Sequence, residues 1–306
     1  MYRLEDLAAL EQNEITSLCQ EFMNPGLVQL LKLIHFDRQF VKAKGSVLTS
    51  DDGTEYLDLL GSYGAVALGH NYPLIIEALI STLLADPPMM FQAGLNRYAA
   101  ALASNLAEVA HGKLRNSFFC NSGTEAVEGA LKAARAATGR RTLISVENSF
   151  HGKTMGALSM TGKAKYQDPF GPLVGDCYSV PFGDIDALER HLSSRNVAGF
   201  IVEPVLGEGG VILHPFKDHE KIETSYLWQA QHLCNKYGTM FILDEIQTGF
   251  GRTGTLFAAE RFGLEPDIMC LAKALGGALM PIGVTMTTPK VWDKAFGGTE
   301  KCLLHT

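Results

Sequence analysis

From residue 117 onward, short apolar runs of strand length alternate with longer stretches in which apolar residues recur at helical spacing. The clearest apolar runs are residues 197–202, 239–243 and 266–271, and residues 141–146 are also predicted as a strand. Nearly continuous hydrophobic runs are typical of parallel strands that are buried on both faces. The alternation therefore predicts an α/β fold in which helices cover both faces of a mainly parallel sheet.

The stretches between these runs carry the periodic apolar pattern of helices. An alanine-rich helix is predicted from the small polar residues near 122 to about Gly139. Further helices are predicted at residues 73–85, 96–109 and 225–237. Each of these lengths is ordinary for a helix in a globular protein.

The first part of the chain has a different pattern. Residues 1–24 are polar and helix-prone, and residues 27–34 resume a helical apolar pattern. Residues 40–48 and 55–59 are predicted as two strands, joined by a turn at Asp51, Asp52 and Gly53.

Composition narrows the class of protein. Of 306 residues, 46% are hydrophobic and 19% are charged, which suits a globular protein with a large buried surface. The net charge of −7 favours neither nucleic acid nor an anionic membrane as partner. We expect no leader and no membrane span. The six cysteines lie far apart without a C-x-x-C pair, so we expect reduced thiols and a cytoplasmic location.

Lys273 follows the apolar run 266–271 and precedes two glycines. Burial disfavours the ammonium form, so the pKa of this lysine should fall. An amine of lowered pKa is a candidate nucleophile for a Schiff base. The alternative is a lysine that extends from a strand end to the surface.

Asp244 ends the apolar run 239–243, a position at which open α/β sheets bind ligands. Pyridoxal 5'-phosphate (PLP) needs a lysine for its aldehyde and an acid to keep its pyridine nitrogen protonated. Lys273 and Asp244 therefore form a chemically complementary pair for PLP.

A third stretch could bind the phosphate of such a cofactor. Ser122, Gly123 and Thr124 stand where a short strand turns into the alanine-rich helix. Backbone N–H groups at a helix start attract anions, and the two hydroxyls could add donors. The alternative is an ordinary helix N-cap.

Together these stretches resemble the class III aminotransferases of the ornithine, acetylornithine and putrescine type, which are fold-type I PLP enzymes. The resemblance is carried, in the family's order, by residues 121–126, 149–154, 203–205, 244–254 and 271–275. It implies a PLP-binding large domain at residues 67–306, built on a mainly parallel sheet of the seven-stranded type. Residues 1–66 would form an N-terminal helical extension and part of a small α+β domain. The chain looks cut short, with the C-terminal small domain absent.

The resemblance also implies roles for single residues. Phe150 would stack on the cofactor ring, and His151 would lie in the pocket. Ile246 would pack against the ring, and Gln247 would bond its phenolic oxygen. Glu203 would orient or gate substrate groups, with a structural salt bridge as the alternative.

Other residues near these motifs remain open. Tyr63 lines the substrate channel or packs as an ordinary aromatic, and His70 is expected to be structural. Arg252 could bind a carboxylate, but the family places it in a structural turn. His214, with His219 and Glu220, could suggest a metal; their spacing is unlike that of ligands on one helix face, so we expect none.

The resemblance implies a PLP-dependent aminotransferase that moves an amino group from an ω-amine donor, a diamine or ornithine-like amine, to a 2-oxo acid such as 2-oxoglutarate. It also implies a homodimer. Two alternatives stay open. One is a PLP decarboxylase or mutase on the same site, and the other is a truncated, catalytically incompetent family member.

Overall fold

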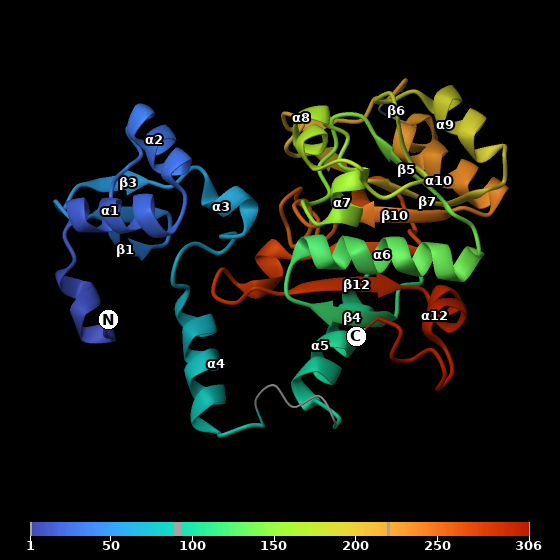
Figure 1. Cartoon of the computed structure of the whole chain (residues 1–306). Helices are drawn as coiled ribbons and strands as arrows, with labels where there is room; N and C mark the ends of the chain where they lie inside the picture. The colour runs from blue at the N-terminus through green and yellow to red at the C-terminus, as the bar shows by residue number, and fades with distance from the viewer. Residues whose placement is uncertain (1, 89–93, 219–220, 306) are drawn as a thin grey trace. The chain divides into compact units, whose positions relative to one another are not determined.

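The computed structural model describes residues 2–88, 94–218 and 221–305 (Figure 1). The chain divides into two compact units, each described by itself. The first comprises residues 1–61 and 69–76, and the second comprises residues 62–68 and 77–306.

The first unit combines short helices with a three-stranded antiparallel sheet. A 3₁₀ turn at Leu4–Ala9 precedes α1 (Gln12–Phe22) and α2 (Pro25–Leu33). The sheet has the order β1 (Phe40–Lys44), β2 (Val47–Ser50) and β3 (Glu55–Leu57).

The prediction of one strand over residues 40–48 is wrong. The chain reverses after Lys44, which pairs with Val47, and Gly45 at the reversal has a φ of 57°. A glycine with positive φ at the first position of a two-residue turn favours a hairpin. The Gly45-Ser46 dipeptide was therefore a turn signal inside the predicted strand.

The second unit contains a sheet with the strand order β4-β12-β11-β10-β7-β5-β6. The central strands pair in parallel, whereas β12 is antiparallel to both of its neighbours. The predicted mainly parallel seven-stranded sheet is confirmed. The strand bounds are β4 (Asn116–Cys120), β5 (Thr142–Val146), β6 (Cys177–Val180), β7 (Val197–Val202), β10 (Met240–Asp244), β11 (Ile268–Leu271) and β12 (Gly283–Thr287). The apolar pattern did not single out β6 and β12.

The first of the remaining helices lie between β3 and β4 along the chain, and the others lie between or after the strands of the larger sheet. Their bounds are α3 (Gly61–Gly64), α4 (Pro73–Leu84), α5 (Arg97–Val109), α6 (Gly123–Thr138), α7 (Met155–Met160), α8 (Ala164–Gln167), α9 (Ile185–Leu192), α10 (Tyr226–Tyr237), α11 (Ala258–Arg261) and α12 (Pro289–Phe296). Shorter elements are the two-residue strands β8 (Val205–Leu206) and β9 (Ile212–Leu213) and 3₁₀ turns at Asp168–Phe170, Ile222–Thr224 and Lys273–Gly276. No helix among the described residues has both the length and the apolar character needed to cross a membrane.

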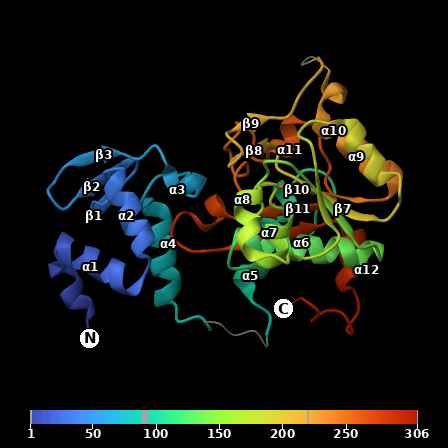
Figure 2. The same cartoon turned by 45° about the horizontal axis from the view of Figure 1, so that its top comes forward.

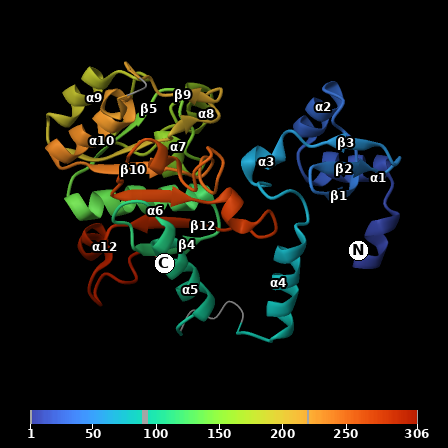
Figure 3. The same ribbon diagram turned by 180° about the vertical axis from the view of Figure 1, so that it is seen from behind.

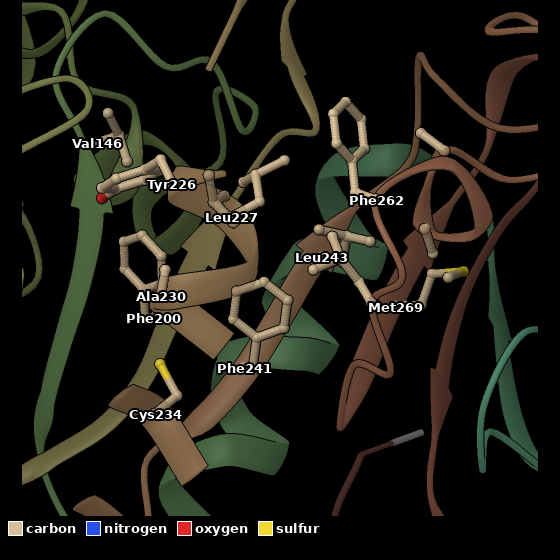
Figure 4. Close-up of a cluster of buried hydrophobic side chains, with 14 of the residues drawn as sticks. Val146, Phe200, Tyr226, Leu227, Ala230, Cys234, Phe241, Leu243, Phe262 and Met269 are labelled. Atoms are coloured by element: carbon tan, nitrogen blue, oxygen red, sulfur yellow. The ribbon is translucent and has the colours of Figure 1, made fainter. Parts of the chain in front are cut away.

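Successive side chains along a strand point to opposite faces of the sheet, so each face has its own hydrophobic core. On β10, Phe241 and Leu243 belong to one cluster, whereas Ile242 between them belongs to the other. Helices α5, α9, α10 and α11 contribute to the first cluster, part of which Figure 4 shows. Helices α6, α7 and α12 contribute to the second. Figure 2 shows the sheet between the two helical layers, and Figure 3 shows α5 beside β4.

Candidate active site

Strand register brings three of the predicted site residues to one edge of the sheet. Asp244 is the last residue of β10 and pairs with Cys270 of the parallel strand β11. Lys273 follows three residues later. On the other side of β10, Leu243 pairs with Val202, which directly precedes Glu203. The carboxyl ends of parallel strands are where open α/β sheets bind ligands.

Lys273 begins a 3₁₀ turn and has a φ of 48°, a left-handed conformation that is uncommon outside glycine. Its side chain is partly buried, and this burial lowers the pKa of its amine below 10.5, although the Asp244 and Glu203 carboxylates partly oppose the shift. Among the described residues, its Nζ has no hydrogen-bond or ion-pair partner. The amine is thus available for chemistry, and its backbone is held in a strained conformation typical of functional positions.

Asp244 is buried and accepts two hydrogen bonds. Its Oδ2 lies 2.7 Å from Nδ1 of His151, and its Oδ1 accepts from the Ile246 backbone N–H at 3.1 Å. His151 is also buried, and its Nε2 has no partner within the described part of the chain. The structure therefore joins two predicted site residues 93 positions apart, with His151 orienting the Asp244 carboxylate.

Glu203 connects two loops. Its Oε1 accepts from the Phe150 backbone N–H at 2.9 Å, and its Oε2 accepts from the Gly207 backbone N–H at 3.0 Å. Burial raises the pKa of this carboxyl group. Within the described ranges it forms no salt bridge, so the alternative of a structural ion pair is not observed.

The start of α6 presents free donors. Ser122 is the N-cap, and its Oγ accepts from the Glu125 backbone N–H at 3.3 Å. The backbone N–H groups of Gly123 and Thr124 have no acceptor among the described residues. A Cβ at Gly123 would lie 2.9 Å from Ile246, so only glycine lets the two segments approach this closely.

Phe150 and Gln247 make contacts that the sequence did not indicate. The Phe150 ring meets Tyr166 edge-on with centroids 6.0 Å apart. Tyr166 in turn donates its hydroxyl to Glu208 at 2.6 Å. Gln247 donates its Nε2 to the backbone oxygen of Tyr63 at 3.0 Å. The Tyr63 side chain is exposed.

The remaining candidates have structural contacts. Arg252 donates to the backbone oxygen of Gly64 at 3.4 Å. His70 lies 2.8 Å from Asp58 within the first unit. Lys163 is only 15% exposed and donates to the backbone oxygen of Glu208 at 2.5 Å.

His214 is buried. Its ring stacks on Tyr226 with centroids 5.2 Å apart, and its Nε2 lies 2.9 Å from the backbone oxygen of Glu203. Burial lowers its pKa to about 4. Its suggested companions His219 and Glu220 lie outside the described residues. Within the residues that are described, no group of three or more His, Cys, Asp or Glu side chains could hold a metal ion.

Comparison with known proteins places this geometry in a family. The family described as aminotransferase class-III matches residues 33–300. The chain belongs to the class-III aminotransferases. Members of this family bind PLP, and the site fits it: a free amine of lowered pKa, a buried carboxylate and two unpaired N–H groups at a helix start are the groups that the cofactor requires.

Individual relatives agree with this assignment. The chain is 42% identical to the aminotransferase PigE of a Serratia species over 94% of its own length, and 42% identical to a putrescine aminotransferase of Pectobacterium atrosepticum over 99%. An ornithine aminotransferase structure from Toxoplasma gondii superposes with a TM-score of 0.82 at 29% identity over 94% of the chain. The chain spans 33%, 64% and 66% of these three proteins, respectively.

Sequence reasoning overlooked three polar side chains that support the predicted ones. Thr154, which precedes α7, donates its hydroxyl to Glu128 on α6, and Tyr166 contacts Phe150. Glu128 is one of only two acids in the alanine-rich helix, which was a signal for it. Thr154 lies in one of the family motifs, and nothing in the local pattern indicated Tyr166.

Proposed function

We propose that the chain catalyses PLP-dependent transamination from an ω-amine donor, a diamine or ornithine-like amine, to a 2-oxo acid such as 2-oxoglutarate. The observation that carries this proposal is the unpaired Lys273 amine, of lowered pKa, at the same sheet edge as the buried Asp244. The donor class is supported by the putrescine and ornithine aminotransferases among the relatives.

Several residues would hold the cofactor. The N–H groups of Gly123 and Thr124, with the hydroxyl of Ser122, would bind its phosphate at the positive end of the helix dipole. Phe150 and Ile246 would pack on the two faces of its ring. Gln247 would donate a hydrogen bond to the phenolic oxygen of the cofactor. The Gln247 amide would then have to release the backbone oxygen of Tyr63 or donate to both oxygens. When bound, PLP supplies an aldehyde that captures amines and a ring that accepts electron density from the substrate.

Lys273 and Asp244 would perform the proton chemistry. A lowered pKa increases the neutral fraction of the Lys273 amine near neutral pH, so its Nζ can accept a proton from the substrate carbon that bears the amino group. Asp244 would hold a proton on the pyridine nitrogen. His151, bonded to the second oxygen of Asp244, keeps that carboxylate aimed at the ring.

Glu203 would act through the loops that it joins. Because both of its oxygens accept backbone N–H groups, it holds the Phe150 loop and the Gly207 turn at a constant spacing. We propose that this spacing orients substrate groups beside the cofactor.

We propose a cytoplasmic location for this chain. All six cysteines are free thiols in the structure, which is typical of a reducing compartment such as the cytoplasm. We propose a homodimer on the basis of the family. We also propose that residues 1–66 and 67–306 form the small-domain segment and the PLP-binding domain.

The proposal is tested by trapping the cofactor. After incubation with PLP and reduction with borohydride, peptide mass mapping should find the cofactor on Lys273. A Lys113→Ala variant, which loses a lysine whose side chain is 83% exposed, should label equally. Reduced cofactor on another lysine would contradict the assigned site.

The reaction is tested with putrescine and ornithine as donors and 2-oxoglutarate as acceptor. Transamination forms glutamate in an amount equal to the oxidised donor. Release of carbon dioxide without glutamate would instead support a decarboxylase.

A further inference from the structure

Glu128 lies on α6, one helical turn after Thr124, and holds the start of α7. Its Oε1 accepts from the Thr154 hydroxyl at 2.6 Å and from the backbone N–H groups of Gly156 and Ala157 at 2.9 and 3.0 Å. The first N–H groups of a helix lack partners within the helix, so a carboxylate from another helix satisfies them here. Glu128 thus joins α6 to the loop that carries Phe150 and His151.

The hydroxyl of Thr154 extends this network to Thr124, because their Oγ1 atoms lie 2.8 Å apart. Each threonine has one hydroxyl proton, whereas an ionised carboxylate can only accept. The Thr154 proton is therefore directed to Glu128, and the bond between the two threonines needs the proton of Thr124. The Thr124 oxygen also accepts from the Thr154 backbone N–H at 3.4 Å.

The surroundings of Thr124 keep its hydroxyl in this position. A Cβ built on Gly152 would lie 2.2 Å from Thr124 Oγ1, so the backbone of Gly152 packs directly against the hydroxyl. Gly152 has a φ of 129°, a backbone conformation that residues other than glycine rarely adopt. The hydroxyl is enclosed between Gly152 and Thr154.

We propose that Glu128, Thr154 and Thr124 form a directed hydrogen-bond relay that turns the Thr124 hydroxyl away from the cofactor phosphate. Phosphate binding by this chain then depends on the backbone N–H groups of Gly123 and Thr124 and on the Ser122 hydroxyl. Glu128 is a positioning residue that touches neither cofactor nor substrate. This inference rests on the proposed function, because that function places the phosphate at α6.

The first test measures the contribution of the phosphate. Dissociation constants of pyridoxamine 5'-phosphate and of pyridoxamine, neither of which carries an aldehyde for Lys273, are compared in each variant. The ratio of the dissociation constant of pyridoxamine to that of pyridoxamine 5'-phosphate should change less than about threefold in Thr124→Val, which keeps the shape and the backbone N–H. In Ser122→Ala the ratio should fall about tenfold or more, because a hydrogen bond to a charged group is lost. A fall in Thr124→Val as large as that in Ser122→Ala would overturn the inference.

The second test needs no ligand. Amide hydrogen exchange at Gly156 and Ala157 should remain slow in Glu128→Gln, which keeps an acceptor oxygen, and become about tenfold faster in Glu128→Leu. Unchanged exchange in a folded Glu128→Leu chain would overturn the relay. If the wild-type chain instead binds pyridoxamine as tightly as its phosphate, the proposed function fails at its phosphate site while the exchange result still decides the relay.

Discussion

Acidification should destabilise the protein through His214, which the fold buries in its neutral form. The Nε2 of this ring bonds the backbone oxygen of Glu203, and the buried Nδ1 has no partner among the described residues. Protonation would place a charged N–H group at Nδ1 without an acceptor, in contact with the rings of Phe182 and Tyr226. Such a group is costly to bury.

The size of the loss in unfolding free energy follows from the pKa of His214, which burial lowers from 6.5 to about 4. Below pH 6.5 the unfolded chain binds a proton that the folded chain does not. The stabilising contribution of neutral His214 is therefore complete above pH 6.5 and declines as the pH falls toward 4. The loss reaches about 3 kcal/mol, because each pKa unit corresponds to about 1.4 kcal/mol.

The matched variant is His214→Phe, which keeps a flat ring between Phe182 and Tyr226 and cannot titrate. Its loss of the bond to Glu203 should cost about 1 kcal/mol at every pH. Urea unfolding of both proteins, followed by tryptophan fluorescence from pH 8 to pH 4.5, gives the difference in unfolding free energy.

Comparison of the two proteins separates the effect of His214 on stability from the effects of the buried carboxyl groups. Burial raises the pKa values of Glu203, Glu245 and Asp267, and these groups act with the opposite sign, because the folded state holds their protons more tightly. Their effect is shared by both proteins. The wild type should lose stability relative to His214→Phe as the pH falls below 6.5. Parallel curves over this range, or an NMR titration of the His214 ring with a midpoint near 6.5, would refute the reasoning.

Further predictions concern the candidate active site. Lys273→Ala should lose the borohydride-trapped cofactor, whereas retention of the trapped cofactor in an intact chain would contradict the assignment. Asp244→Asn should lower glutamate formation by at least about a hundredfold in the transamination assay, because charge stabilisation is removed from the ring; near-normal turnover would mean that another group protonates the ring nitrogen. Gly123→Ala should lower the unfolding free energy by about 1–3 kcal/mol in urea, since the new methyl group meets Ile246, and an unchanged urea midpoint would argue against the close approach. Glu203→Gln cannot accept both backbone bonds with oxygen, so amide exchange at Phe150 or Gly207 should accelerate, and protection of both would count against the loop connection.

The sequence by itself determined the fold class and indicated which residues to consider for the candidate site. Apolar runs such as 239–243 mark strands that are buried on both faces, because each residue of such a strand meets one of two cores. Asp244 and Lys273 stand at the ends of two such runs, which was sufficient to predict that they lie at the same edge of the sheet. The Gly45-Ser46 turn was missed because residues on both sides of it favour strands, and a two-residue turn is a short signal between them.

Only the tertiary structure decided how polar groups pair. His151 meets Asp244, Glu203 caps two loops, and Glu128 reaches across from α6 to Thr154. These partners are separated by 26 to 93 positions, so no local periodicity encodes them. Hydrophobic pattern reports which face of an element is buried, but hydrogen bonds depend on atomic positions that exist only after strand register and helix packing are set.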